Sequence, residues 1–167
     1  KFVFGNGNLN SSIVFIGGAP DENDEKKGNT FEGEVGELFT KMLKAINLKR
    51  ENIYSCYAVN FRPLFDRKPS TNEIKRYSFF LQSHISIINP KVIVLMGSIA
   101  MEAITGLNNK ISSHRGAWKE TIIKNKNFPT MITFDPSYLI RFPENKKYSW
   151  EDLKKIKKKI EDLNIKI

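Results

Sequence analysis

Apolar positions along the chain follow two different periods. Short continuous apolar runs predict buried strands, and one further run with polar neighbours predicts a strand at a sheet edge. Elsewhere, apolar residues recur at the three- and four-residue spacing of helices that bury one face. The predicted strands span residues 13–17, 52–59, 91–97, 118–124 and 128–134, and the predicted helices span residues 35–46, 70–88, 98–106 and 149–163.

Strands and helices that alternate along a chain are typical of a parallel sheet with helices on both faces. We therefore predict an α/β fold, a three-layer α/β/α sandwich around a central, mainly parallel four-stranded sheet. The 167 residues contain no repeat and no low-complexity segment, so we expect a single domain over residues 1–167.

Basic residues outnumber acidic ones, and the net charge is +9. This charge favours nucleic acid as a partner, with an anionic membrane surface second, although lysines that only serve solubility give the same excess. No apolar run reaches the roughly 18 residues of a membrane span, so we expect no membrane insertion. Cys56 is the single cysteine, which excludes a disulfide framework and indicates a reducing location, cytoplasmic, organellar or nucleoid-associated.

Polar loops follow the predicted strands, at the sheet edge where α/β folds place their sites. Gly17, Gly18 and Ala19 begin a long polar loop over residues 18–33 and let the backbone approach a ligand closely. Phe31 in this loop is either a packing plug or a platform for a flat ring. The residues expected to hold phosphates or to form an apolar wedge are Arg62, Ser98, Ser137, Leu139, Ile140 and Arg141.

A ring platform, phosphate donors and a wedge together describe a protein that handles an unstacked base. The ordered motifs of the chain are more specific. They are Gly-Gly-Ala-Pro at 17–20, Gly-Asn-Thr-Phe-Glu-Gly-Glu-Val-Gly at 28–36, Asn-Phe-Arg-Pro at 60–63, Asn-Pro-Lys-Val-Ile-Val-Leu-Met-Gly at 89–97, Arg-Gly-Ala-Trp at 115–118 and Asp-Pro-Ser-Tyr-Leu-Ile-Arg at 135–141. In these motifs the chain resembles the uracil-DNA glycosylase superfamily, and most closely its iron–sulfur, family 4 type. The resemblance implies that fold, and DNA as the partner.

Three positions depart from the family's pattern. By resemblance, Gly18 stands where the family has a Glu that helps to place the hydrolytic water, and Tyr57 replaces an Asn that reads the uracil edge. Asp135 replaces a His that stabilises the departing uracil anion, and a carboxylate beside a forming anion raises the reaction barrier. The expected base pocket consists of Gly17, Gly18, Ala19, Phe31 and Tyr57.

The family's cluster cysteines are also replaced. Two of the four align with Phe61 and Tyr77, and the other two fall before Lys1. Since Cys56 is the only cysteine, we expect no iron–sulfur cluster, no other cofactor and no metal.

These substitutions favour a DNA-binding member of the superfamily that is weakly active or inactive on uracil. We expect a monomer, with a protein partner or fusion to a larger DNA-processing protein as further options. One alternative is an active DNA glycosylase of base excision repair, which hydrolyses the N-glycosidic bond of uracil or another deaminated base. Asp135 or Asp21 would then be its catalytic carboxylate, although aspartates in such loops also serve as turn caps. A second alternative is a module of this fold that binds a protein or a nucleotide.

Overall fold

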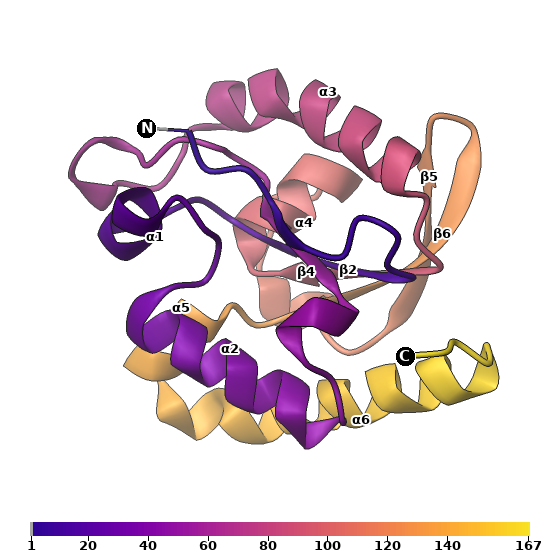
Figure 1. Cartoon of the computed structure of the whole chain (residues 1–167). Coiled ribbons are helices and arrows are strands. Elements are labelled where there is room, and N and C mark those ends of the chain that lie inside the picture. The colour runs from indigo at the N-terminus through magenta and orange to yellow at the C-terminus, as the bar shows by residue number, and fades with distance from the viewer. Residues whose placement is uncertain (1) are drawn as a thin grey trace.

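The computed structural model describes residues 2–167 and has a sheet of six strands as its middle layer (Figure 1). In chain order the strands are β1 (Asn6–Gly7), β2 (Ile13–Gly17), β3 (Tyr54–Tyr57), β4 (Val92–Met96), β5 (Trp118–Ile123) and β6 (Lys126–Thr133). They lie side by side in the order β1-β3-β2-β4-β6-β5. The four central strands β3, β2, β4 and β6 run parallel, whereas β1 and β5 pair antiparallel at the two edges.

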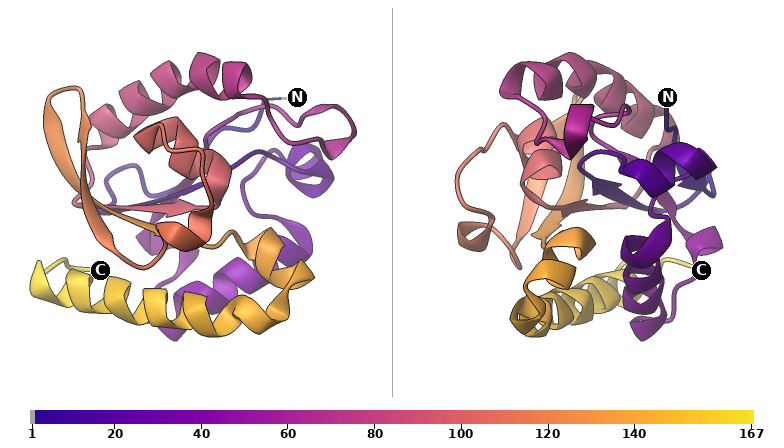
Figure 2. Two further views of the ribbon diagram at one scale, coloured as in Figure 1. Left: turned by 180° about the vertical axis from the view of Figure 1, so that it is seen from behind. Right: turned by 90° about the vertical axis from the view of Figure 1, so that its left-hand side faces the viewer.

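Helices cover both faces of the sheet, as the views in Figure 2 show. They are α1 (Glu22–Lys27), α2 (Gly33–Ala45), α3 (Thr71–Ile88), α4 (Ser98–Thr105), α5 (Pro136–Arg141) and α6 (Lys146–Asp162). Helices α3 and α4 pack on one face, and α2, α5 and α6 pack on the other. Within residues 2–167 there is no helix with the length and apolar character needed to cross a membrane.

The alternation of side chains along the strands divides the core into two layers. In β2, Ile13 and Phe15 point toward α2 and α6, whereas Val14 and Ile16 point toward α3 and α4. All four side chains are at most 1% exposed. A strand that is apolar on both faces can only be stable between two helical layers, which is why a continuous apolar run predicted its position.

The predicted three-layer α/β/α sandwich is confirmed, but the sheet has six strands rather than four. The parallel centre agrees with the prediction, and β5 is an edge strand as expected. Strand β1 was missed because its two residues, Asn6 and Gly7, carry no apolar pattern. Its pairing with Ser55 and Tyr54 comes from tertiary structure alone.

Two short helices lie where the sequence predicted only loops. Helices α1 and α5 have six residues each, too few for an apolar period to be visible. Their N-caps are Asp21 and Asp135, whose carboxylates accept hydrogen bonds from backbone N–H groups of the first turn. Both predicted catalytic aspartates therefore begin helices.

A buried ion pair fastens α6 to the sheet. The Asp152 carboxylate is fully buried and accepts hydrogen bonds from Arg115 Nη2 at 2.6 Å and from Thr133 Oγ1 at 2.7 Å. Gly116, at φ +84°, lies so close that a Cβ there would stand 2.9 Å from Asp152 Oδ1. The Arg115–Gly116 turn, the end of β6 and α6 are thus held together by one carboxylate.

Replacing Asp152 with Ala should lower the free energy of unfolding by about 2–3 kcal/mol, measured by urea denaturation. Removing one member of a buried pair typically costs roughly 3–5 kcal/mol, and the partial exposure of Arg115 reduces this loss. The control is Asp162→Ala, which removes an exposed pair with Lys158 on the same helix and should change the stability by less than about 0.5 kcal/mol. Equal losses in the two variants would contradict this role for Asp152.

Candidate functional site

A cleft of about 600 Å³ opens at the carboxyl ends of β2, β4 and β6, and we call it the strand-end cleft. Parallel strands bring their following loops to this one edge, so residues far apart in the sequence meet there. Its lining residues include Gly18, Ala19, Pro20 and Asp21 after β2, Pro63, Asp66, Arg67, Lys68 and Pro69 of the loop after β3, Gly97, Ser98 and Ile99 after β4, and Phe134, Asp135, Ser137, Tyr138 and Arg141 after β6. Most of the predicted site residues therefore share one cleft.

Asp135 lies in the wall of the strand-end cleft beside the β4–α4 turn. Its carboxylate accepts hydrogen bonds from Ser137 Oγ at 2.9 Å and from the Ser137 backbone N–H at 3.3 Å. Burial raises the pKa of this carboxyl group above its ordinary value of 3.8, while the Ser137 hydrogen bonds and the charge of Arg141 act in the opposite direction. The group can therefore donate a hydrogen bond when protonated and accept a proton when ionised.

Asp21 borders the same cleft but is engaged in a helix cap. Its Oδ1 accepts a hydrogen bond from the Asp24 backbone N–H at 3.0 Å, and Asp24 Oδ2 accepts one from the Asp21 N–H at 3.0 Å. Such a reciprocal capping box satisfies two N–H groups at the start of α1. Asp21 also lines the cleft, so it is both the cap of α1 and a part of the candidate site.

The predicted ring platform lies beneath the cleft, not in its wall. Phe31 and Tyr57 are 3% and 5% exposed, and their ring centroids are 5.0 Å apart. On another side, the Phe31 ring packs against Phe39 at 4.5 Å. Gly17 packs directly against both rings, since a Cβ there would stand 2.7 Å from Phe31 Cζ and 3.0 Å from Tyr57 Cδ1. A base could therefore stack on Phe31 only if the Tyr57 ring moved away.

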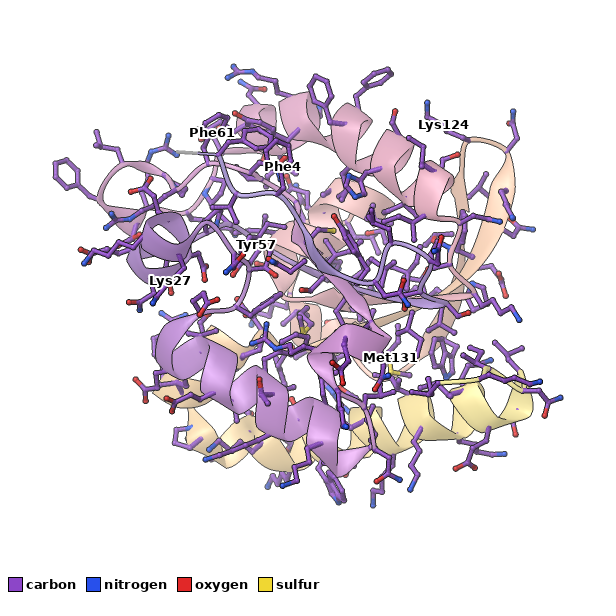
Figure 3. The ribbon with its side chains drawn as sticks, viewed as in Figure 1. Phe4, Lys27, Tyr57, Phe61, Lys124 and Met131 are labelled. Atoms are coloured by element: carbon purple, nitrogen blue, oxygen red, sulfur yellow. The ribbon has the colours of Figure 1, made fainter. Side chains whose placement is uncertain are left out.

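The Tyr57 hydroxyl is fixed by hydrogen bonds on two sides. It donates to Asp24 Oδ2 at 2.6 Å and accepts from the Phe31 backbone N–H at 2.9 Å. Burial, followed by the neighbouring Asp24 carboxylate, holds the pKa of Tyr57 well above its ordinary value of 10.0, so the phenol stays protonated. Figure 3 shows Tyr57 in the interior of the molecule, near the sheet and the helix α1, which ends at Lys27.

The cations around the strand-end cleft differ in how they are engaged. Arg62 makes a bidentate pair with Asp66, at 2.8 and 3.1 Å, and its side chain does not border the cleft. Arg67 pairs in the same way with Glu73, at 2.6 and 2.9 Å. Arg141 is exposed and borders the cleft, with its guanidinium 5.8 Å from the Phe142 ring centroid.

The two residues of the predicted wedge point in different directions because α5 is a helix. Leu139 is 1% exposed and belongs to the core between α2 and α6, so it cannot insert between bases. Ile140 is half-buried on the same helix. The sequence predicted a loop for this segment, and a loop has no two faces that would separate Leu139 from Ile140.

Two residues at the site were missed from the sequence. Tyr138 borders the strand-end cleft, stacked on Phe134 at 5.0 Å, and it lies inside the motif at 135–141 that had already been singled out. Lys68 also borders the cleft from the loop after β3. An aromatic residue three positions after Asp135 was a usable signal, whereas Lys68 carried none beyond its charge.

Comparison with known proteins identifies the family. The uracil DNA glycosylase superfamily matches residues 4–157. The chain belongs to this superfamily. It is 37% identical over 158 residues to a type-4 uracil-DNA glycosylase of Thermotoga maritima, a match that covers 93% of this chain and 81% of that protein. It is 36% identical over 163 residues to the Sulfurisphaera tokodaii enzyme of the same name, with 93% and 73% covered, and 31% identical over 160 residues to that of Archaeoglobus fulgidus, with 93% and 80% covered.

These relatives contradict the prediction that the protein has no cofactor. They are type-4 enzymes, the type identified above as iron–sulfur proteins, so membership of the family does not support a cluster-free protein. Residues 2–167 nevertheless do not by themselves fit a four-cysteine cluster. They contain one thiol, Cys56, whose pKa burial raises to about 12, and no group of three or more His, Cys, Asp or Glu side chains that could hold a metal ion.

The surroundings of the two replaced cysteine positions are aromatic. The Phe61 and Tyr77 rings lie 6.0 Å apart, and Phe61 also contacts Phe2 at 4.9 Å. An apolar cavity of about 360 Å³ lies beside them, between the first residues of the chain and α3, with Tyr77 and Phe80 in its wall. The Phe2 ring packs against Phe4 as well, at 4.3 Å, and Figure 3 labels Phe4 and Phe61.

The partly buried carboxyl of Asp135 gives a pH-dependent prediction. Because its pKa is raised in the folded protein, its stabilising contribution is complete below pH 3.8 and is lost as the pH rises through the raised value. Asp135→Asn keeps an oxygen that caps α5 but carries no charge. It should therefore be more stable than the wild type near pH 7, and the gain should vanish in acid.

The measurement is the free energy of unfolding of both proteins, obtained by urea denaturation at several pH values. Asp162→Asn, at an exposed position of α6, should show no such gain. An Asp135→Asn variant that is less stable than the wild type by the same amount at every pH would contradict the assignment.

Proposed function

We propose that this chain is a single-domain DNA-binding member of the superfamily that removes uracil weakly or not at all. The observation that carries the proposal is the Tyr57 ring. It packs against Phe31, and its hydroxyl is tied to Asp24. A base that enters toward Phe31 would have to displace a buried ring and break a hydrogen bond of 2.6 Å to a carboxylate.

The charge at position 135 points in the same direction. Excision of uracil leaves an anion, and a donor or a cation beside that anion would stabilise the transition state. The carboxylate of Asp135 would repel it, and Ser137 Oγ already donates its hydrogen bond to that carboxylate. Gly18 supplies no side chain to place a water molecule. The charge of Asp135, the engaged hydroxyl of Ser137 and the missing side chain at Gly18 would each disfavour the excision of uracil.

The groups that remain are suited to holding DNA. Arg141 and Lys68 can neutralise phosphates, and Ser98 lines the same strand-end cleft. The net charge of +9 favours the approach of any polyanion. Such a role places the protein in a compartment that contains DNA, the cytoplasm or an organelle with a nucleoid.

The raised pKa of Asp135 favours a second candidate, an active glycosylase of altered specificity. A protonated Asp135 could donate a hydrogen bond to the departing base, and Asp21, across the same cleft, could orient water when ionised. The related proteins are named glycosylases, which supports activity of some kind.

A strand-scission assay separates the two candidates. Oligonucleotides that contain uracil, hypoxanthine or xanthine are incubated with the protein, and abasic sites are then cleaved with alkali. Under the first proposal, the hypoxanthine and xanthine oligonucleotides are cut no faster than a matched oligonucleotide without the lesion, and the uracil oligonucleotide is cut at most slightly faster. Scission that is present in the wild type and lost in Asp135→Ala would overturn it and establish the second candidate.

Replacing Arg141 with Ala should weaken binding of DNA about 3- to 10-fold at 50 mM salt and reduce the magnitude of the slope of log K against log salt by about 1. Fluorescence anisotropy of a labelled oligonucleotide measures both quantities. The control is Lys91→Ala, which removes the same charge from an exposed position directly before β4, at the opposite edge of the sheet. Equal effects of the two variants would show that binding depends on net charge and not on the cleft.

A further inference from the structure

A second cavity, of about 540 Å³, adjoins the strand-end cleft, and we call it the flanking cavity. The two share Ile111, Phe134 and Tyr138 as common wall residues. We infer that the flanking cavity is a subsite for the nucleotide next to the one in the strand-end cleft, and that the ligand is single-stranded DNA. This inference rests on the proposed DNA-binding function and specifies its substrate class.

The shared wall is a stack of aromatic rings. The ring centroids of Phe134 and Tyr138 are 5.0 Å apart, and the two rings are nearly parallel, with 21° between their planes. The Phe142 ring follows, with its centroid 4.9 Å from that of Tyr138. Asn145 Nδ2 lies 3.4 Å from the Tyr138 hydroxyl, at the start of α6. A rigid ring with a cavity on each side is the arrangement that receives successive bases and keeps them apart.

Tyr148 of α6 supplies a second aromatic surface in the flanking cavity. The residue is 37% exposed and lines the cavity. The Arg115 guanidinium carbon lies 5.2 Å from the ring centroid, and Asp152 fixes this arginine in turn. The ring is thus held from below by the same buried pair that fastens α6 to the sheet, and it needs little ordering when a base stacks on it.

Cations stand on both sides of the shared wall. Arg141 borders the strand-end cleft, and Lys110 borders the flanking cavity at an exposed position. Lys147 Nζ lies over the Tyr148 ring, 5.2 Å from the ring centroid. The phosphate that joins two nucleotides on either side of Tyr138 would therefore meet a positive charge from each direction.

The geometry selects a single strand over a duplex. Paired bases in a duplex stack directly on one another, so two neighbours cannot enter cavities that a tyrosine ring separates. Each cavity, at about 600 and 540 Å³, falls in the range of sites that hold a nucleotide-sized ligand. An unpaired strand can distribute its bases over the two cavities without any cost of strand opening.

The test is fluorescence anisotropy at low salt with a labelled oligothymidylate of about eight nucleotides and with a duplex of the same length. We expect the wild type to prefer the single strand. Tyr148→Ala should raise the Kd for the single strand about 5- to 100-fold, as expected for the loss of one stacked base. Tyr148→Phe, which keeps the ring, should stay within about 2-fold of the wild type.

The matched control is Trp150→Ala, because Trp150 is an aromatic residue of the same helix, is 46% exposed and lies outside the flanking cavity. It should change the Kd less than about 2-fold, and circular dichroism should show both alanine variants folded. If the wild type binds DNA but Tyr148→Ala and Trp150→Ala bind equally well, or the duplex binds more tightly, the subsite inference is overturned while the proposed function stands. If the wild type binds neither DNA, both are overturned, and a protein- or nucleotide-binding module becomes the explanation.

Discussion

The segment between β2 and α2, which contains α1, is held in place by one buried carboxylate. Asp24 is 2% exposed and accepts hydrogen bonds from three groups, the backbone N–H groups of Asp21 and Glu32 and the hydroxyl of Tyr57. These bonds close the loop at both ends and connect it to the end of β3. Burial raises the pKa of Asp24, and the three donors act in the opposite direction. Without them the segment would hold an unsatisfied charge in the interior, which costs several kcal/mol or more.

Arg50 completes this constraint from the other side of the loop. Its Nη2 donates hydrogen bonds to the carbonyl oxygens of Phe31 at 2.6 Å and Gly36 at 3.0 Å, and its guanidinium carbon lies 4.8 Å from the Phe39 ring centroid. The backbone at Phe31 has φ +52°, in the left-handed region that is uncommon for residues other than glycine. An unfavourable conformation of this kind persists only where surrounding contacts determine it fully. Here the contacts direct the Phe31 ring into the core beside Tyr57.

The sequence was informative wherever a feature depends on neighbouring residues, and uninformative where it depends on contacts between distant ones. Continuous apolar runs were sufficient to place the strands β2, β3, β4 and β6, and alternation with helices was sufficient to make them parallel. Because loops after parallel strands meet at one edge of the sheet, the sequence also predicted that most site residues lie together there. The bond between Asp24 and Tyr57 joins residues 33 positions apart and left no local signal. Leu139 was assigned to the wedge for a different reason, because the six residues of α5 are too few for an apolar period to reveal which side of the helix is buried.

The substitution at position 135 connects stability with function. An aspartate at an N-cap satisfies backbone donors that would otherwise lack a partner, and replacing such a cap with alanine typically costs about 0.5–2 kcal/mol. Asp135 performs this task for α5 through Ser137, the residue whose hydroxyl would otherwise be free to contact a phosphate. The same carboxyl group is partly buried, so its ionised form is held at some cost to the folded state. Asp135 therefore supports α5 independently of any part that it takes in a reaction. Tyr138, Arg141 and the aromatic wall depend on α5 and not on the chemistry of position 135, so the proposed binding of DNA does not require hydrolysis of an N-glycosidic bond.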